Sequence, residues 1–210
     1  KELTLNWTNA IAGDLNSLGY VSEINKQRDF YRRYVSPNVS KGNRVFVVIS
    51  DALRFEVAAE LSEALSHTTK GKATLEAVQT VFPSITKFGM AALLPGKELT
   101  ISDKMEVSID GNPTGSTANR EAILIAANPD SVAITYKDLL QMKKIERRAL
   151  VQGKEIVYIY HNTIDALGDK PATETKVFEA CDAAISELNA IVRIIVNDLS
   201  GVNIFITADH

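Results

Sequence analysis

The stretch Val45-Phe46-Val47-Val48-Ile49 is a continuous run of apolar residues, most of them β-branched. A run without polar alternation is typical of a strand that is covered on both faces, and such strands occur mainly in parallel sheets. An amphipathic helical pattern follows it over residues 55–66. A buried strand that leads into a helix indicates an α/β domain.

Strand and helix patterns then alternate to the end of the sequence. Further strands are expected near residues 73–80 and over residues 132–135, 155–160 and 203–207. Helices are expected after Pro83 to Leu94 and over residues 119–127, 137–151 and 174–198. Residues 96–118 are rich in Gly, Asp, Ser and Thr, which predicts a long loop with room for a hairpin. The alternation favours a three-layer α/β/α sandwich with a mostly parallel central sheet.

The composition is that of an ordinary globular domain and excludes some classes of protein. The 210 residues are 45% apolar and 23% charged, with a formal net charge of −3. A sizeable core can therefore be buried, and no general affinity for nucleic acid is indicated. Cys181 is the only cysteine, so this chain can form neither a disulfide framework nor a cysteine-based zinc site. No stretch approaches the roughly 20 apolar residues of a membrane helix. We expect a cytoplasmic protein without a membrane partner.

Residues 1–40 differ from the rest in the pattern of their apolar residues, and they are expected to be a helical lead-in from an upstream region. Apolar residues recur there at near-helical spacing, at Leu3, Trp7, Ile11, Leu15 and Leu18. Ser36-Pro37-Asn38 breaks this pattern. The core domain is expected over residues 41–210. The sequence begins without methionine and stops at a strand end, so we expect an excised domain that is cut short at its C-terminus.

Polar side chains follow four of the expected strands, at the point where each strand ends. They are Asp51, Thr86, the segment His161–Asp169, and Asp209-His210. In open parallel sheets, ligands bind beyond the carboxyl ends of the strands, so these side chains are expected at one edge. Imidazole with carboxylate favours zinc, whereas an all-oxygen set favours magnesium or manganese. Two ions can stabilise both oxygens of a phosphoryl transfer, and a metal-bound threonine hydroxyl can attack phosphorus.

Each of these residues, taken singly, also has an ordinary structural interpretation. Asp51 can cap the helix that follows it, and Thr86 can simply begin a helix. His161 can be a hydrogen-bonded residue of the interior. Cys181, in the middle of an expected helix, is interpreted as a small buried apolar residue. The candidate site therefore depends on the conjunction of four strand ends.

The order of these motifs resembles the alkaline phosphatase superfamily, with an Asp after the first strand, Phe-Pro-x-x-Thr before a helix, and Thr-Ala-Asp-His after a late strand. More narrowly, four segments resemble the signature of the PglZ family, namely Val48–Glu56, Pro83–Thr86, Thr117–Arg120 and Tyr160–Asp169. The resemblance covers about residues 36–210. It implies an alkaline phosphatase-like fold and the phosphatase component of a BREX phage-resistance system. PglZ domains also occur fused to response-regulator receivers.

The resemblance implies a set of metal ligands and a nucleophile. Carried over by motif position, Asp51, Asp209 and His210 hold one divalent ion, and Thr86 bridges to it as the nucleophile. Ser84 lies two residues earlier and is the rival hydroxyl, although the family register favours Thr86.

A second ion is expected on Asp165 and Asp169, together with a histidine beyond residue 210. The phosphodiesterase relatives carry a histidine where Asp169 stands, so this sequence departs from the pattern there. We expect two divalent ions, zinc in the first place, with manganese or magnesium favoured if the carboxylate replaces an imidazole. His161 could compensate as a ligand, but its spacing equally fits a contact with substrate.

Four further residues are candidates for contact with substrate: Arg54, Arg120, His161 and Asn162. A guanidinium offers a bidentate fork for phosphate, which motivates the two arginines. Arg54 stands at a helix start, where an arginine is more often simply solvated.

The function predicted first is metal-dependent hydrolysis of a phosphomonoester or phosphodiester through a threonine nucleophile, in bacterial phage defence or signalling. The expected partners are a phosphate-ester substrate, which could be a nucleotide or nucleic acid, and other phage-defence proteins. The alternative is a catalytically weak or inactive alkaline phosphatase-like scaffold within a multi-protein BREX complex. Other nucleotide-binding domains are disfavoured because neither Gly-x-Gly-x-x-Gly nor a P-loop motif is present. A sulfatase and a phosphoglycerate mutase are disfavoured because their motifs are missing.

Overall fold

A computed structural model of the chain describes residues 2–68, 71–168 and 176–210. Its centre is a four-stranded parallel sheet with the strand order β7-β8-β2-β9. The strands are β2 (Val45–Ser50), β7 (Ser131–Thr135), β8 (Ile156–His161) and β9 (Asn203–Ala208). Ser50 is in register with His161 on one side and Ala208 on the other, so three strands end level at one edge. The mixed α/β class with a parallel sheet is confirmed.

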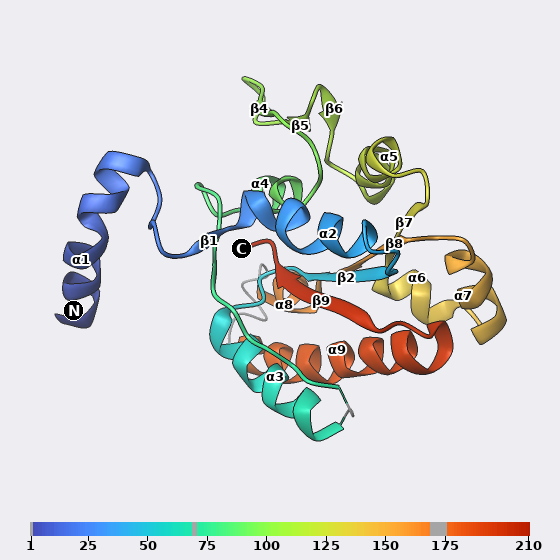
Figure 1. Cartoon of the computed structure of the whole chain (residues 1–210). Helices are drawn as coiled ribbons and strands as arrows, with labels where there is room; N and C mark the ends of the chain where they lie inside the picture. The colour runs from blue at the N-terminus through green and yellow to red at the C-terminus, as the bar shows by residue number, and fades with distance from the viewer. Residues whose placement is uncertain (1, 69–70, 169–175) are drawn as a thin grey trace.

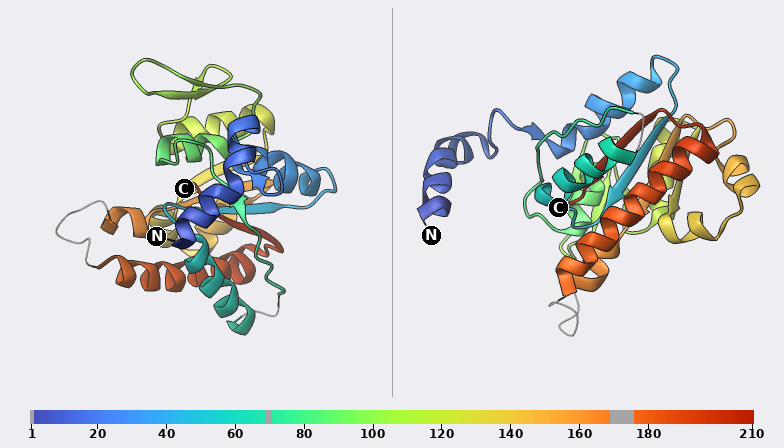
Figure 2. Two further views of the ribbon diagram at one scale, coloured as in Figure 1. Left: turned by 90° about the vertical axis from the view of Figure 1, so that its left-hand side faces the viewer. Right: turned by 90° about the horizontal axis from the view of Figure 1, so that it is seen from below.

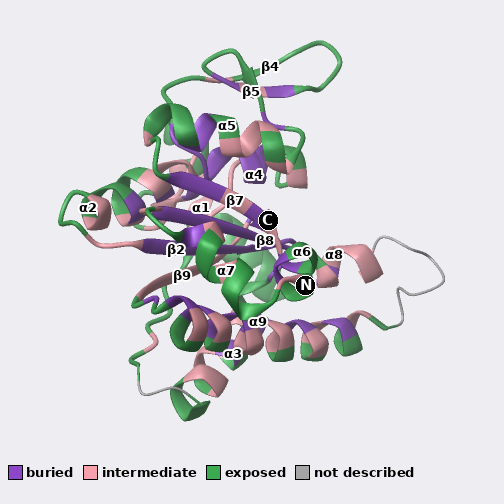
Figure 3. Cartoon of the chain, turned by 90° about the vertical axis from the view of Figure 1, so that its right-hand side faces the viewer, coloured by how far each residue is buried: buried purple, intermediate pink, exposed green. Residues whose placement is uncertain are grey.

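The burial of the strands follows their position in the sheet. Every residue of β2 and β8 is buried, whereas the residues of β9 are all half-buried. Among the described strands β9 pairs only with β2, which leaves its other edge open (Figure 3). The prediction that the apolar run at 45–49 is a strand covered on both faces is correct.

Alternate residues of β2 belong to two different clusters of the core. Phe46 and Val48 pack with residues of α3 (Phe55–Thr68) and α9 (Val177–Leu199). Val45 and Val47 pack with residues of α4 (Thr86–Ala92) and α5 (Thr117–Ala127). Figure 1 shows the first pair of helices on one side of the sheet and the second pair on the other. Because successive strand residues point to opposite faces, one apolar run fills both clusters.

Several helix boundaries differ from those expected. The helix predicted after Pro83 to Leu94 is confined to α4, and α9 begins at Val177. The single helix predicted at 137–151 is two helices, α6 (Tyr136–Gln141) and α7 (Lys144–Val151). Lys143 separates them in an extended conformation, and its backbone N–H donates to Oε2 of Glu146 at 2.5 Å. This hydrogen bond stabilises the first turn of α7, at a place where the periodic apolar pattern predicted one uninterrupted helix.

The strand predicted near 73–80 was wrong in length and in location. Only β3 (Val78–Gln79) is a strand, and it pairs with β1 (Asn25–Lys26), not with the central sheet. Most side chains of residues 71–77 are exposed, so this segment buries too little apolar surface to hold a place in the sheet.

The loop predicted at 96–118 contains more structure than one hairpin. It holds the antiparallel strands β4 (Leu99–Ile101), β5 (Val107–Ile109) and β6 (Asn112–Pro113). Val107 and Ile109 are buried and anchor this small sheet on the cluster that contains α4.

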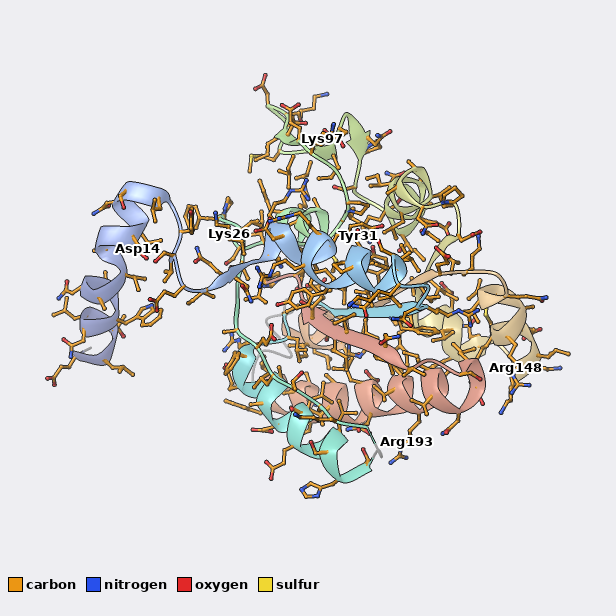
Figure 4. All side chains as sticks on the ribbon, viewed as in Figure 1. Asp14, Lys26, Tyr31, Lys97, Arg148 and Arg193 are labelled. Carbon is orange, nitrogen blue, oxygen red and sulfur yellow. The ribbon has the colours of Figure 1, made fainter. Side chains whose placement is uncertain are left out.

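The N-terminal residues form two separate parts. The helix α1 (Glu2–Leu18) has no buried residue and stands apart from the rest in Figures 1 and 2. Asp14, labelled in Figure 4, lies in the last part of this helix. Its Oδ2 accepts hydrogen bonds from the backbone N–H and the hydroxyl of Ser22, at 2.8 and 2.7 Å.

The second part packs on the core. It consists of a 3₁₀ turn (Gln27–Asp29), a π-helix (Tyr31–Val35) and α2 (Ser36–Val39). The expected break at Ser36-Pro37-Asn38 is thus the start of a helix, where proline is tolerated. Phe30 and Val35 are buried there. None of the helices in the described ranges has the length and apolar character that crossing a membrane requires.

Candidate metal centre

The carboxyl ends of β2 and β9 bring together residues that are more than 150 positions apart. Asp51 directly follows β2, and Asp209 and His210 directly follow β9. Nε2 of His210 lies 3.4 Å from Oδ1 of Asp51 and 3.9 Å from Oδ2 of Asp209. The pairing of β2 with β9 therefore creates the cluster.

Thr86 reaches the same cluster from α4. Its Oγ1 lies 3.4 Å from Oδ1 of Asp51 and 3.3 Å from Nε2 of His210. Thr86 is the first residue of α4 and is only partly buried. A hydroxyl at this position is therefore both held by the cluster and open to an incoming group.

Two residues that the sequence analysis did not single out position these elements. Gly89 lies against the chain at Asp209, where a β-carbon would stand 1.9 Å from the carbonyl oxygen. Buried Gln27 donates from Nε2 to the carbonyl oxygens of Ala208 and Asp209, at 3.0 and 2.6 Å. Its Oε1 accepts from the backbone N–H of Val81 at 3.2 Å. No motif marks either residue, because their role arises from contacts that are distant in sequence.

Asp165 contributes a further carboxylate from α8 (Thr163–Gly168). Asp51, Asp165 and His210 each offer one ligand atom, and these atoms lie within 4.8 Å of one another. Their donor set, two carboxylates and an imidazole, suits a divalent cation such as zinc or manganese.

Asp209 is the most deeply buried carboxylate of the cluster. Its Oδ1 accepts from the backbone N–H groups of Ala52 and His210, at 3.1 and 2.9 Å. Its Oδ2 is buried and has no hydrogen-bond partner among the described residues. A buried carboxylate oxygen without a partner is costly, and a cation beside it would remove that cost.

The two strand-end aspartates are buried next to each other, which disfavours their charged forms. Burial raises the pKa of Asp51 to about 7, and the neighbouring Asp209 carboxylate adds to the shift. Burial likewise raises the pKa of Asp209. Within the described ranges, the only ion-pair partner of either carboxylate is His210. The residues thus fit a divalent ion, which would favour the charged form of both groups.

The other described residues predicted for the site have different surroundings. His161 is buried, with Nδ1 2.9 Å from the Ser50 hydroxyl and Nε2 2.7 Å from Glu187, so both ring nitrogens are already engaged. Asn162 and Ser84 are exposed. Asp169 lies outside the described residues.

The two arginines predicted for substrate occupy different surroundings. Arg54 is exposed, just before α3. Arg120, in α5, stacks over the ring of Tyr160 at 4.2 Å. In the part of the chain that the structure describes, neither the buried Nε of Arg120 nor the buried hydroxyl of Tyr160 has a hydrogen-bond partner. Burial raises the pKa of the Tyr160 phenol.

A groove of about 650 Å³ extends from His210 along β9 and α3. Its lining includes four aromatic side chains, those of Phe30, Tyr34, Phe55 and Phe205. Arg54 and Lys72 add positive charge to its walls. The volume and the mainly apolar lining are those of small-molecule sites.

Carboxylates, an imidazole and a hydroxyl at the carboxyl edge of a parallel sheet define an α/β domain with a candidate centre for divalent ions. A sequence model of the "BREX system PglZ alkaline phosphatase-like domain" matches residues 30–210. The chain therefore belongs to the PglZ family, as its motifs predicted.

Two curated relatives are similar over the whole chain. The chain is 43% identical over 209 residues to the "Alkaline phosphatase-like protein PglZ" of Bacillus cereus (strain H3081.97). It is 42% identical over 214 residues to the "Alkaline phosphatase-like protein BrxZ" of Escherichia coli O9:H4 (strain HS). Both alignments include 100% of this chain but only 24% of the relative, so the chain spans about a quarter of their length.

Proposed function

We propose that this domain hydrolyses phosphate esters, with Thr86 as the nucleophile and a metal centre built on Asp51, Asp209 and His210. The observation that supports it most directly is the convergence of one hydroxyl on a carboxylate and an imidazole. Oγ1 of Thr86 lies 3.4 Å from Asp51 and 3.3 Å from His210. Thr86, Asp51 and His210 come from three elements, and a helix-capping role for Thr86 or Asp51 would not require this meeting.

In the proposed reaction, Oγ1 of Thr86 attacks phosphorus in line with the ester oxygen. The bond from phosphorus to Thr86 forms, the bond to the leaving alcohol breaks, and the hydroxyl proton passes to the solvent or to a neighbouring base. Water then cleaves the phosphothreonine and restores the hydroxyl. A divalent ion on Asp51, Asp209 and His210 would stabilise negative charge on the phosphoryl group and on the threonine oxygen.

We infer that the centre binds two divalent ions, as the resemblance to the alkaline phosphatase superfamily implies. Asp165 lies close enough to Asp51 and His210 to share a centre with them, and we assign it, with Asp169, to the second ion. The set is rich in carboxylates, so manganese or magnesium can replace zinc there.

The organic part of the ester would extend from His210 into the groove along β9. The names of the relatives support a place for this domain in a BREX system, with other defence proteins as partners. We also propose that the core at 41–210 is a three-layer α/β/α sandwich, that residues 1–40 are a lead-in to it, and that the protein acts in the cytoplasm.

The test uses the full-length protein and two chromogenic substrates, p-nitrophenyl phosphate and bis(p-nitrophenyl) phosphate, with Zn²⁺, Mn²⁺ or Mg²⁺ added. Thr86→Ala should lower kcat by about 10³-fold or more, because it removes the nucleophile. Ser84→Ala, two residues away and exposed, is the matched control and should keep parental activity.

Two outcomes would decide against the proposal. If Thr86→Ala is as active as the parent, the threonine mechanism is wrong. A parent that binds metal tightly but turns over neither substrate would instead support the catalytically inactive scaffold.

A further inference from the structure

Behind the candidate metal centre, one carboxylate oxygen of α9 accepts two hydrogen bonds. Oε2 of Glu187 lies 2.7 Å from Nε2 of His161 and 2.5 Å from Oγ1 of Thr163. His161 ends β8, and Thr163 begins α8. Glu187 therefore joins α9 to the end of a central strand and to the start of the helix that follows it.

The first of these hydrogen bonds continues to β2. Nδ1 of His161 lies 2.9 Å from the hydroxyl of Ser50, the residue before Asp51. The backbone N–H of Asp51 also donates to the carbonyl oxygen of His161 at 2.8 Å. The His161 side chain is fully buried, so its ring cannot exchange these partners for water.

The protons in this chain can be assigned from the chemistry of the groups. An ionised carboxylate only accepts, so Nε2–H of His161 donates to Glu187. Nδ1 is then the acceptor of a hydrogen bond that the Ser50 hydroxyl donates. Burial lowers the pKa of His161, which is consistent with a neutral ring.

The second hydrogen bond fixes the start of α8. Thr163 is two residues before Asp165, which lies in the first turn of that helix. Helix α8 packs against α9, with Ile164 buried in the core cluster that includes Leu188, and the bond from Thr163 to Glu187 fixes the first residue of α8 on α9. The same oxygen thus holds the segments that carry Asp51 and Asp165.

We propose that Glu187 is a positioning residue for the metal centre. Among the described residues it accepts hydrogen bonds from His161 and Thr163, and it acts through Ser50, His161 and Thr163 on the two carboxylates. Outer partners that orient metal ligands typically contribute about 10- to 100-fold to metal affinity. The inference rests on the proposed function, because it requires that Asp51 and Asp165 are ligands of the proposed divalent ions.

The experiment measures the dissociation constant for Mn²⁺ and Zn²⁺ by isothermal titration calorimetry on the full-length, metal-free protein. Glu187→Ala removes both hydrogen bonds and should weaken binding by about 10- to 100-fold. Thr163→Val removes only the bond to α8, with little change of shape, and should also weaken binding. Thermal unfolding in chelator shows whether each variant is folded at the temperature of the titration.

A conservative variant separates positioning from charge. Glu187→Gln can place its amide oxygen where Oε2 lies and can accept both hydrogen bonds. It should therefore bind metal within about threefold of the parent, well below the typical loss for a missing outer partner. Glu179→Ala, on the same helix and exposed, is the matched control and should leave the affinity unchanged.

The outcomes distinguish this inference from the function on which it rests. Failure of the parent to bind either ion overturns the proposed function, and the role of Glu187 with it. If the parent binds metal and folded Glu187→Ala and Thr163→Val bind it equally well, only the role of Glu187 is overturned. Equal losses in Glu187→Gln and Glu187→Ala would likewise overturn positioning through these two hydrogen bonds.

Discussion

Gly89 and Asp209 touch backbone to backbone: a β-carbon on residue 89 would lie 1.9 Å from the carbonyl oxygen of Asp209 and 2.5 Å from its carbonyl carbon. Residue 89 is on α4, one turn after Thr86, and Asp209 follows β9. The absence of a side chain at this point lets the helix approach the end of the strand. This contact is what brings the threonine hydroxyl to the imidazole of His210.

Gly89→Ala should therefore move α4 away from the cluster. We expect a loss of about 1–3 kcal/mol in the free energy of unfolding, as for overpacked sites, and a large fall in phosphatase activity. Thermal unfolding and turnover of p-nitrophenyl phosphate measure the two effects. Gly115→Ala, where a β-carbon meets no atom within 4 Å, is the control. Parental activity in Gly89→Ala would show that Thr86 does not need this approach.

Gln27 should stabilise the end of β9 through both ends of its amide. Gln27→Ala removes the donor to the carbonyl oxygens of Ala208 and Asp209, and the hydrogen bond to Asp209 is buried. We expect a loss of about 1–3 kcal/mol in unfolding free energy and weaker metal binding. Chemical denaturation and calorimetry provide the measurements. Gln141→Ala, on the surface, should have no effect on either; equal behaviour of the two variants would contradict the role given to Gln27.

Asp209→Asn should change stability and metal affinity in opposite directions. In the metal-free protein it removes one of two neighbouring buried carboxylates, so the melting temperature should rise. In the presence of Mn²⁺ or Zn²⁺ the substitution removes a ligand, so the affinity for the ion should fall. We expect a loss of at least about tenfold, because losing a group that only orients a ligand already costs about that much. Asp182→Asn, on the exposed surface, serves as the control. A variant that lost stability without metal would show that Asp209 is not destabilising when the ion is absent.

The stability that Asp51 contributes to the metal-free protein should fall as the pH rises. The ordinary pKa of an aspartate is about 3.9, and that of Asp51 in the folded chain is raised to about 7. Between these values the folded state holds a proton that the unfolded state has lost, so each rise in pH favours unfolding.

Denaturant midpoints are measured from pH 4 to pH 7.5 without metal for the parent and for Asp51→Asn, because other groups, such as His161 with its lowered pKa, affect both proteins alike. The midpoint of the parent relative to that of Asp51→Asn should decrease across this interval. Saturating Mn²⁺ should reduce or reverse the decrease, because the bound ion favours the ionised carboxylate. A difference that increases from pH 4 to pH 7 under chelation would contradict this assignment.

The parallel core was predictable because its signals are local and strong. The apolar run at 45–49, the matching runs of β8 and β9, and the helices between them have the periods of buried strands and amphipathic helices. The segment 73–80 is half polar, with Glu76 in its middle, and it does not join the sheet; the surroundings, not the propensity, decide whether a short strand is covered. The division of α6 from α7 depended on one hydrogen bond between Lys143 and Glu146.

The sequence by itself determined which residue types stand at the ends of the strands, because a buried parallel strand must deliver its last side chains to one edge of the sheet. It thereby indicated Asp51, Asp209 and His210 as neighbours at one edge, whereas the resemblance to the PglZ family implied Asp165, and Thr86 follows a strand that does not join the central sheet. Only the tertiary structure decided that His161 turns to Glu187 and that Gly89 and Gln27 hold the meeting point of α4 and β9. The reason is physical. A strand pattern predicts which residues reach the edge of the sheet, but the groups that contact their side chains come from segments far away in the chain. The positions of those segments depend on packing.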